Sequence, residues 1–194
     1  MGHIQRISSR VAPVLGLLIF VGCADVAQMG TPAHRWDHQA AQRGPNGQTW
    51  PDWPAVSYQP IPLSPDADKA GQEYAAIVWD DTGIYGLVYG LACPAIEITC
   101  TAKDGQGRKL IIDADQVPPP EHRQSLGILR ASDADAPHKH LPPALFRYVD
   151  RGWLGQAGQC QSEFWLAWSA LPNDGHGCKT VMTVAGHKLC FPWR

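Results

Sequence analysis

Residues 73–89 read EYAAIVWDDTGIYGLVY, and this stretch determines the fold class. An apolar run at Glu73–Asp80 is followed by Asp81–Gly83, whose residue types are typical of a tight turn. A second run, Ile84–Tyr89, is rich in residues that favour strands. Two apolar runs joined by a short turn predict a β-hairpin.

The same pattern continues on the carboxyl side of this hairpin. Residues 96–101 (IEITCT) alternate with a period of two, which predicts a half-buried strand. A glycine-rich turn at 104–107 then leads into another predicted strand at 108–113 (RKLIID). Three more short strands are predicted, the last two as a hairpin around Ala185-Gly186: 126–130, 180–184 and 187–191.

The region between these strands gives weaker signals. Residues 132–143 are polar and interrupted by prolines, which predicts a loop. Residues 144–149 predict a short helix with Pro143 in its first turn. The apolar stretch 162–171 (SEFWLAWSAL) fits either a helix or a strand.

These elements define a mainly β or α+β fold. We expect a small antiparallel sandwich or partial barrel of about seven short strands with one or two short helices, stapled by disulfides. The regular alternation of strands with long helices that a parallel sheet requires is absent. Residues 72–194 are predicted to form this single β-rich domain.

Upstream of the domain, residues 23–71 predict a proline-rich tether, because such chains are extended and semi-rigid. Four aromatic residues interrupt it: Trp36, Trp50, Trp53 and Tyr58. We therefore expect 48–61 to pack along the domain or onto a partner, and 24–43 to stay mobile. Trp50 and Trp53 are candidate contacts for a protein partner, and stacking on the sugar rings of peptidoglycan is the alternative.

The amino terminus has the organisation of an export signal. Arg6 and Arg10 precede an apolar run at Val11–Gly22, which ends at Cys23. This run is shorter than the roughly 20 residues of a membrane-spanning helix. Residues 1–22 are therefore predicted to be a cleaved signal peptide.

The end of this signal, Phe20–Cys23, resembles the lipobox of bacterial lipoproteins. The resemblance implies cleavage before Cys23 and attachment of a lipid with acyl chains such as palmitate to its thiol. The residue after the cysteine is Ala24 rather than aspartate. By resemblance, this implies sorting to the outer membrane, with the domain facing the periplasm. Cleavage after Ala24 and plain secretion remain the alternative.

The chain has 6 cysteines, and those other than Cys23 are disulfide candidates in an exported protein. They are Cys93, Cys100, Cys160, Cys178 and Cys190. Their odd number allows at most two bridges and leaves one free thiol. Proximity in sequence favours Cys93 with Cys100, and Cys160 with Cys178 or Cys190. Buried, unpaired thiols are the alternative.

Charge and motifs exclude several function classes. The formal net charge is −2, and no basic cluster suited to nucleic acid is present. No nucleophile elbow, phosphate loop, zinc-protease motif or Cys-x-x-Cys occurs, so no cofactor is predicted. His138 and His140, together with Asp133, Asp135 or His122, are metal-ligand candidates, and an exposed polar loop is the alternative.

Three functions remain open after this search. The first is a non-catalytic, lipid-anchored envelope protein whose domain binds or scaffolds another protein in an envelope assembly. The second is a periplasmic inhibitor or immunity protein that uses a loop such as 132–143 to block a toxin or a wall hydrolase. The third is a papain-like peptidase acting on peptidoglycan, with Cys160 at a helix start and with His176 and His187 downstream.

Overall fold

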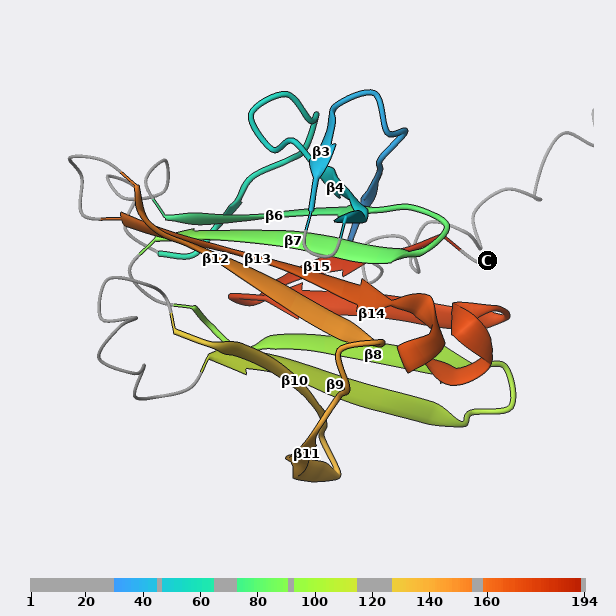
Figure 1. Ribbon diagram of the computed structural model, residues 1–194. Coiled ribbons are helices and arrows are strands. Elements are labelled where there is room, and N and C mark those ends of the chain that lie inside the picture. Colours follow the sequence, from blue (N-terminus) through green and yellow to red (C-terminus); the bar gives the residue numbers. More distant parts are fainter. Residues whose placement is uncertain are drawn as a thin grey trace, which may run out of the picture.

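The computed structural model describes residues 30–44, 47–64, 73–90, 93–114, 127–154 and 159–192. Two β-sheets lie face to face, and a small hairpin covers the outer side of one of them (Figure 1). The prediction of a mainly β sandwich is confirmed.

One layer is a 7-stranded sheet with the order β1-β15-β14-β8-β9-β10-β11. All its neighbours are antiparallel except β1 and β15, which run parallel. Its strands, in chain order, are β1 (Thr31–Pro32), β8 (Ile96–Ala102), β9 (Gly107–Ala114), β10 (Leu129–Asp133), β11 (Ala136–His140), β14 (Cys178–Val184) and β15 (His187–Cys190).

The other layer is a 6-stranded sheet with the order β12-β13-β7-β6-β2, in which β5 also pairs with β6. Its strands are β2 (His34–Arg35), β5 (Ile61–Pro62), β6 (Tyr74–Trp79), β7 (Gly83–Gly90), β12 (Phe146–Leu154) and β13 (Gln159–Ala167). The hairpin predicted from residues 73–89 is the β6–β7 pair at the centre of this sheet.

The remaining elements are short. A hairpin of β3 (Ala41–Arg43) and β4 (Thr49–Pro51) lies above the 6-stranded sheet (Figure 1). Two 3₁₀ turns, η3 (Trp168–Ala170) and η4 (Pro172–Gly175), connect β13 to β14. None of the helical elements in the described residues is long and apolar enough to cross a bilayer.

The main core lies between the two sheets. Alternate residues of β8, namely Ile96, Ile98 and Cys100, are 0% exposed and face inward. Phe164 and Leu166 of β13 enter the same core from the other sheet. The period-two pattern in the sequence therefore corresponds to real inward and outward faces.

Two local predictions were wrong. Residues 146–154 form β12 rather than a helix, because they pair along β13, a partner that local propensity cannot reveal. Residues 132–143 are largely the β10–β11 hairpin rather than a loop. Pro137 is tolerated in β11 because this is an edge strand, where a missing N–H costs no ladder bond. These pairings also raise the strand number above about seven.

The predicted tether is only partly a spacer. As expected, 48–61 packs along the domain, since Trp50, Trp53 and Ile61 are buried. The expectation that 24–43 stays mobile is wrong from Gly30 onward. Strands β1 and β2 pair with β15 and β6, and the Trp36 amide donates to the Trp79 carbonyl at 2.8 Å. Cys23 and the signal peptide lie outside the described residues.

The β6–β7 turn anchors this amino-terminal segment through two carboxylates. Asp81 accepts two hydrogen bonds from Arg35, at 2.9 and 3.1 Å. Asp80, which is 1% exposed, accepts bonds from Thr82 within the turn and lies 3.2 Å from His38 Nε2. The turn thus stabilises both the hairpin and the segment that crosses it.

Candidate functional site

The outer face of the 6-stranded sheet carries its side chains in rows. The strand register determines which residues lie side by side in each row. One row consists of Tyr74, Tyr89 and Gln161, which are direct partners on β6, β7 and β13. The next row runs through Leu87 and Glu163. The remaining row contains Val78, Tyr85 and Trp165, with Arg147 on β12.

Residues 36–44 and 47–58, which we call the covering segment, lie over most of these rows. Trp36, Trp50, Trp53 and Val56 form a second buried cluster with the outward residues of β6 and β7. The rings of Trp36 and Trp50 meet Tyr85 edge-on, with centroids 5.2 and 5.7 Å apart. The outer face therefore has its own core, built largely of tryptophan.

A pocket of about 450 Å³ lies between the covering segment and the sheet. We call it the tyrosine pocket. The covering segment contributes Gln42, Asp52, Trp53, Pro54 and Tyr58, and the sheet contributes Tyr74, Leu87, Tyr89, Arg151, Gln161 and Glu163. This volume falls within the range of about 300–1,000 Å³ typical of small-molecule sites.

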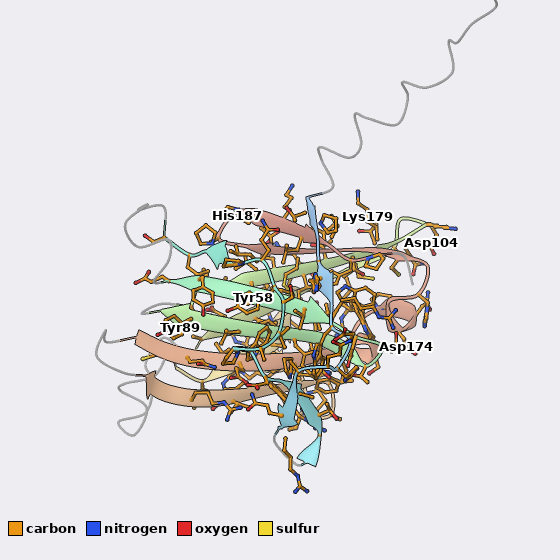
Figure 2. The ribbon with its side chains drawn as sticks, turned by 90° about the horizontal axis from the view of Figure 1, so that it is seen from above. Tyr58, Tyr89, Asp104, Asp174, Lys179 and His187 are labelled. Atoms are coloured by element: carbon orange, nitrogen blue, oxygen red, sulfur yellow. The ribbon has the colours of Figure 1, made fainter. Side chains whose placement is uncertain are left out.

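One side of the tyrosine pocket is a row of rings. Tyr58 stacks on Tyr74 with centroids 6.2 Å apart and planes at 15°, and Tyr74 lies 5.3 Å from Tyr89. Trp53 meets Tyr58 edge-on at 5.9 Å. Figure 2 views this face from above, with Tyr58 and Tyr89 labelled. Burial, and then the hydrogen bond with Tyr58, raise the pKa of the Tyr74 hydroxyl above its ordinary value.

The other side of the pocket is polar and internally paired. The Glu163 side chain is 1% exposed and accepts hydrogen bonds from Arg151 Nε at 3.2 Å and Nη2 at 3.4 Å. Gln161 Nε2 donates to the same carboxylate at 2.6 Å. A buried carboxylate must be paired, and these hydrogen bonds supply its partners. The same network holds all three side chains in fixed positions.

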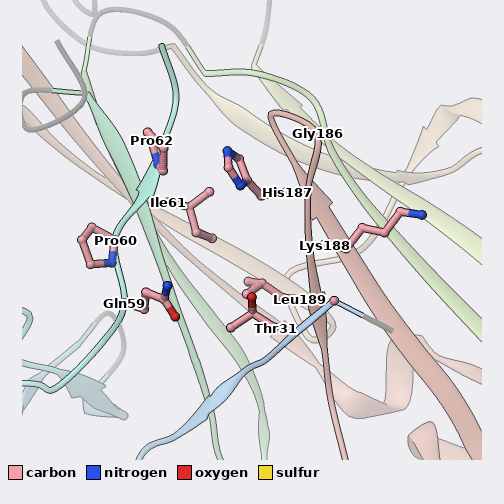
Figure 3. Close-up of a pocket in the computed structure, with 10 residues that line it drawn as sticks. Thr31, Gln59, Pro60, Ile61, Pro62, Gly186, His187, Lys188 and Leu189 are labelled. Atoms are coloured by element: carbon pink, nitrogen blue, oxygen red, sulfur yellow. The ribbon is translucent and has the colours of Figure 1, made fainter. Parts of the chain in front are cut away.

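A larger cavity, of about 840 Å³, lies between the edges of the two sheets (Figure 3). Its walls are the Gln59–Pro62 segment on one side and Gly186–Leu189 on the other, with Gly30 and Thr31 beside them. His187 and Lys188 are both exposed, and no carboxylate is among the described residues that line it. The smaller tyrosine pocket combines aromatic rings with a buried ion pair, so it is the better candidate site.

The two tryptophans predicted as partner contacts are buried in the structure. Trp50 and Trp53 are 0% and 2% exposed, so neither presents an indole face to a partner or a sugar ring in this conformation. The proline-rich sequence predicted an exposed segment. Burying each indole against the sheet lowers the free energy more than leaving it in water, because apolar surface is removed from solvent. Trp53 keeps a functional position as one wall of the tyrosine pocket.

The favoured disulfide pairs are not supported. Cys93 precedes β8, whereas Cys100 lies four residues past Ile96, about 13 Å along that strand. Cys160 lies opposite Gly90 in one sheet, and Cys178 lies opposite Ala102 at the far end of the other. A bridge needs Cα atoms within about 7 Å.

Cys190 is also a poor partner for Cys160. Its neighbour Leu189 points into the core, so the side chain of Cys190 points to the outer face of its sheet. The structure instead brings together Cys100 and Cys178, on adjacent strands β8 and β14, with their thiols in hydrogen-bond contact. Burial, and then this contact, raise the pKa of Cys100 to about 11. The five cysteines within the described ranges are all thiols in this structure.

The histidine candidates do not form a metal site with described neighbours. His138 and His140 are exposed on edge strand β11, and Asp133 is engaged by Arg108 at 2.8 Å. That contact lowers the pKa of Asp133. No group of three metal-ligating side chains occurs within the described ranges, and His122 lies outside them.

Two premises of the alternative functions are wrong. Cys160 lies within strand β13, at no helix start, and burial raises its pKa, whereas a nucleophilic cysteine needs a lowered one. The loop expected to block a hydrolase is mostly the β10–β11 hairpin. Neither the peptidase nor the inhibitor thus gains support from the geometry.

The tyrosine pocket was not predicted from the sequence. The available signal was the alternation in 74–89 and 159–167, which assigns tyrosine, glutamine and glutamate to one face. Only the register between β7 and β13 shows that Tyr89 lies beside Gln161. The contribution from residues 42–58 depends on a tertiary contact with no periodicity of its own.

Comparison with known proteins found no matching family model, no matching curated protein and no matching solved structure. Function must therefore be argued from the site itself.

Proposed function

We propose that this chain is a lipid-anchored protein of the bacterial cell envelope, whose non-catalytic β-sandwich domain binds a ligand in the tyrosine pocket. The observation that carries this proposal is the pocket itself. Aromatic rings and polar groups converge there on a rigid sheet, and the polar groups are fixed by their own hydrogen bonds.

The state of the pocket's acid favours binding over catalysis. The carboxylate of Glu163 is already engaged by Arg151 and Gln161. A general base must instead be able to reach a substrate proton. Among the described residues that line the pocket there is also no serine, cysteine or histidine.

The binding test is a thermal-shift screen of the purified full-length protein against fractions of envelope extract. A ligand at 100 times its Kd should stabilise the fold by about 2.7 kcal/mol, which is a rise of about 5–10 °C in Tm. The variants Tyr89→Leu and Gln161→Ala should lose the shift, and Gln106→Ala, in an exposed turn on the other sheet, should keep it. An equal shift in all variants would show that the pocket is not the site.

The anchor is tested at Cys23. The apolar run before it and the lipobox resemblance support lipid attachment there. We expect the Cys23→Ser protein to remain uncut or to be released from membranes on fractionation. A Cys23→Ser protein that stays in the membrane fraction at mature size would contradict lipidation at this residue.

We also propose that Cys100 and Cys178 form a disulfide in the oxidising envelope, as a diagonal bridge between adjacent strands. Thiol counting on denatured, unreduced mature protein should then detect Cys93, Cys160 and Cys190 but not this pair. The loop that the bridge closes is long, so Cys100→Ala/Cys178→Ala should lower the free energy of unfolding by about 2–4 kcal/mol. Peptide mapping that finds both thiols free in protein taken from the envelope would contradict the bridge.

A further inference from the structure

We infer that the ligand of the tyrosine pocket is a neutral oligosaccharide. This inference rests on the proposed binding function and names its ligand class. Three features of the pocket favour such a ligand: its charge balance, its free hydrogen-bonding groups and the arrangement of its rings.

The charge balance disfavours an anionic ligand. Arg151 is the one cation among the described lining residues, and Glu163 already takes two of its donors. Asp52, which lines the pocket from the segment that covers the sheet, adds a carboxylate with no ion-pair partner among the described residues. A phosphate or carboxylate ligand would meet this acid without finding a free cation of its own.

The ring arrangement disfavours a quaternary ammonium ligand. Such a cation sits in a cage whose ring faces surround it. Here Tyr58, Tyr74 and Tyr89 pack against one another, with centroids 5.3–6.2 Å apart and planes within 31° of parallel. The rings therefore form a strip with no cation-sized space between neighbours. Within the row, neighbouring rings cover one another, so a pyranose would pack its apolar C–H face against Tyr89, whose one aromatic neighbour among the described residues is Tyr74.

The free polar groups fit hydroxyls, because each hydroxyl both donates and accepts a hydrogen bond. Gln42 donates its amide to the Pro51 carbonyl at 2.8 Å, and Gln161 donates to Glu163. Each amide oxygen is thus held in place and left available as an acceptor. Arg151 retains Nη1 as a donor, and the carboxylate of Asp52 remains as an acceptor.

The decisive measurement is calorimetric titration of the purified full-length protein with two probes. Chitotetraose tests a glycan of N-acetylated amino sugars, as in the cell wall, and cellotetraose tests a plain hexose chain. We expect at least one probe to bind. Both Tyr89→Leu and Gln161→Ala should weaken that binding tenfold or more, and Gln106→Ala should match the wild type. Both pocket positions are only partly buried, so the variants should fold, which their Tm will verify.

A second experiment separates this inference from the proposed function. Hot acid hydrolysis cleaves the glycosidic bonds of plain and N-acetylated sugars alike, so it should abolish the thermal shift produced by an active envelope fraction, whereas protease treatment should leave the shift unchanged. If neither probe binds and the shift survives acid hydrolysis, the ligand is not an oligosaccharide, and the inference is overturned while the binding function stands. Probe binding that is equal in the wild type and both pocket variants would overturn the assignment to this pocket.

Discussion

Replacing Trp50 by alanine should lower the free energy of unfolding by about 3–5 kcal/mol, the cost of removing a fully buried large side chain. Trp50 is 0% exposed, although it lies in a segment that reads as a spacer. It packs edge-on against Tyr85 and approaches Gly44 so closely that a Cβ there would lie 2.9 Å from the indole. Urea unfolding measured by circular dichroism is the test.

Thr49 supplies the matched control, since it precedes Trp50 in the same strand and is exposed. Thr49→Ala should change stability by no more than about 0.5 kcal/mol. Trypsin gives a second readout, because Arg35 and Arg43 lie in β2 and β3. Both sites should be cut faster in Trp50→Ala than in the wild type. Unchanged unfolding and cleavage would mean that the covering segment does not stabilise the sandwich.

Replacing Arg151 by methionine should also be costly, at about 2–4 kcal/mol. Removing one partner of a buried ion pair leaves the other charge uncompensated, which typically costs about 3–5 kcal/mol. Here Glu163 is 1% exposed, but the Arg151 side chain is 35% exposed, so water can replace part of the lost interaction. Chemical denaturation of the variant measures the loss.

Two further variants show whether the isolated charge is the cause. The double variant Arg151→Met/Glu163→Leu removes the buried charge as well, so it should recover most of the lost stability. Arg147→Met is the single control for loss of an arginine that forms no ion pair in the described structure. Arg147 lies on the same strand over the Trp165 ring, at 5.3 Å, and donates to Pro143 and Gln48, so this variant measures the cost of such neutral contacts alone. A double variant no more stable than Arg151→Met would contradict this account.

The class of the fold and its central hairpin were predictable from sequence. Residues 73–89 carry their own turn, and residues 96–113 carry a period-two pattern, so neighbours in sequence became neighbours in the sheet. Prediction failed at β12, because Pro143 fits the first turn of a helix as well as the turn that precedes this strand. It failed at β11 because proline is excluded from central strands but not from edges.

For the cysteines, the sequence supplied candidates but no correct pairing. Proximity along the chain joined Cys93 to Cys100, whereas strand register brings Cys100 next to Cys178. The same limit applied to Trp50 and Trp53. Packing of 48–61 along the domain was one of two predicted alternatives, and the structure confirms it. The surface that the two tryptophans cover, however, depends on the sheet beneath them.

By itself, then, the sequence determined the alternation that makes two-faced strands, the turns between adjacent strands and the prediction of export and lipid attachment at Cys23. These are local properties, set by side-chain periodicity and by short motifs. Only the tertiary structure decided that the segment containing Trp50 and Trp53 covers the outer sheet, and that Tyr58 lies beside Tyr74 at the edge of that cover. The pocket is built from segments far apart in the chain, and the contacts that join them come from non-directional burial of apolar surface, which leaves no period in the sequence.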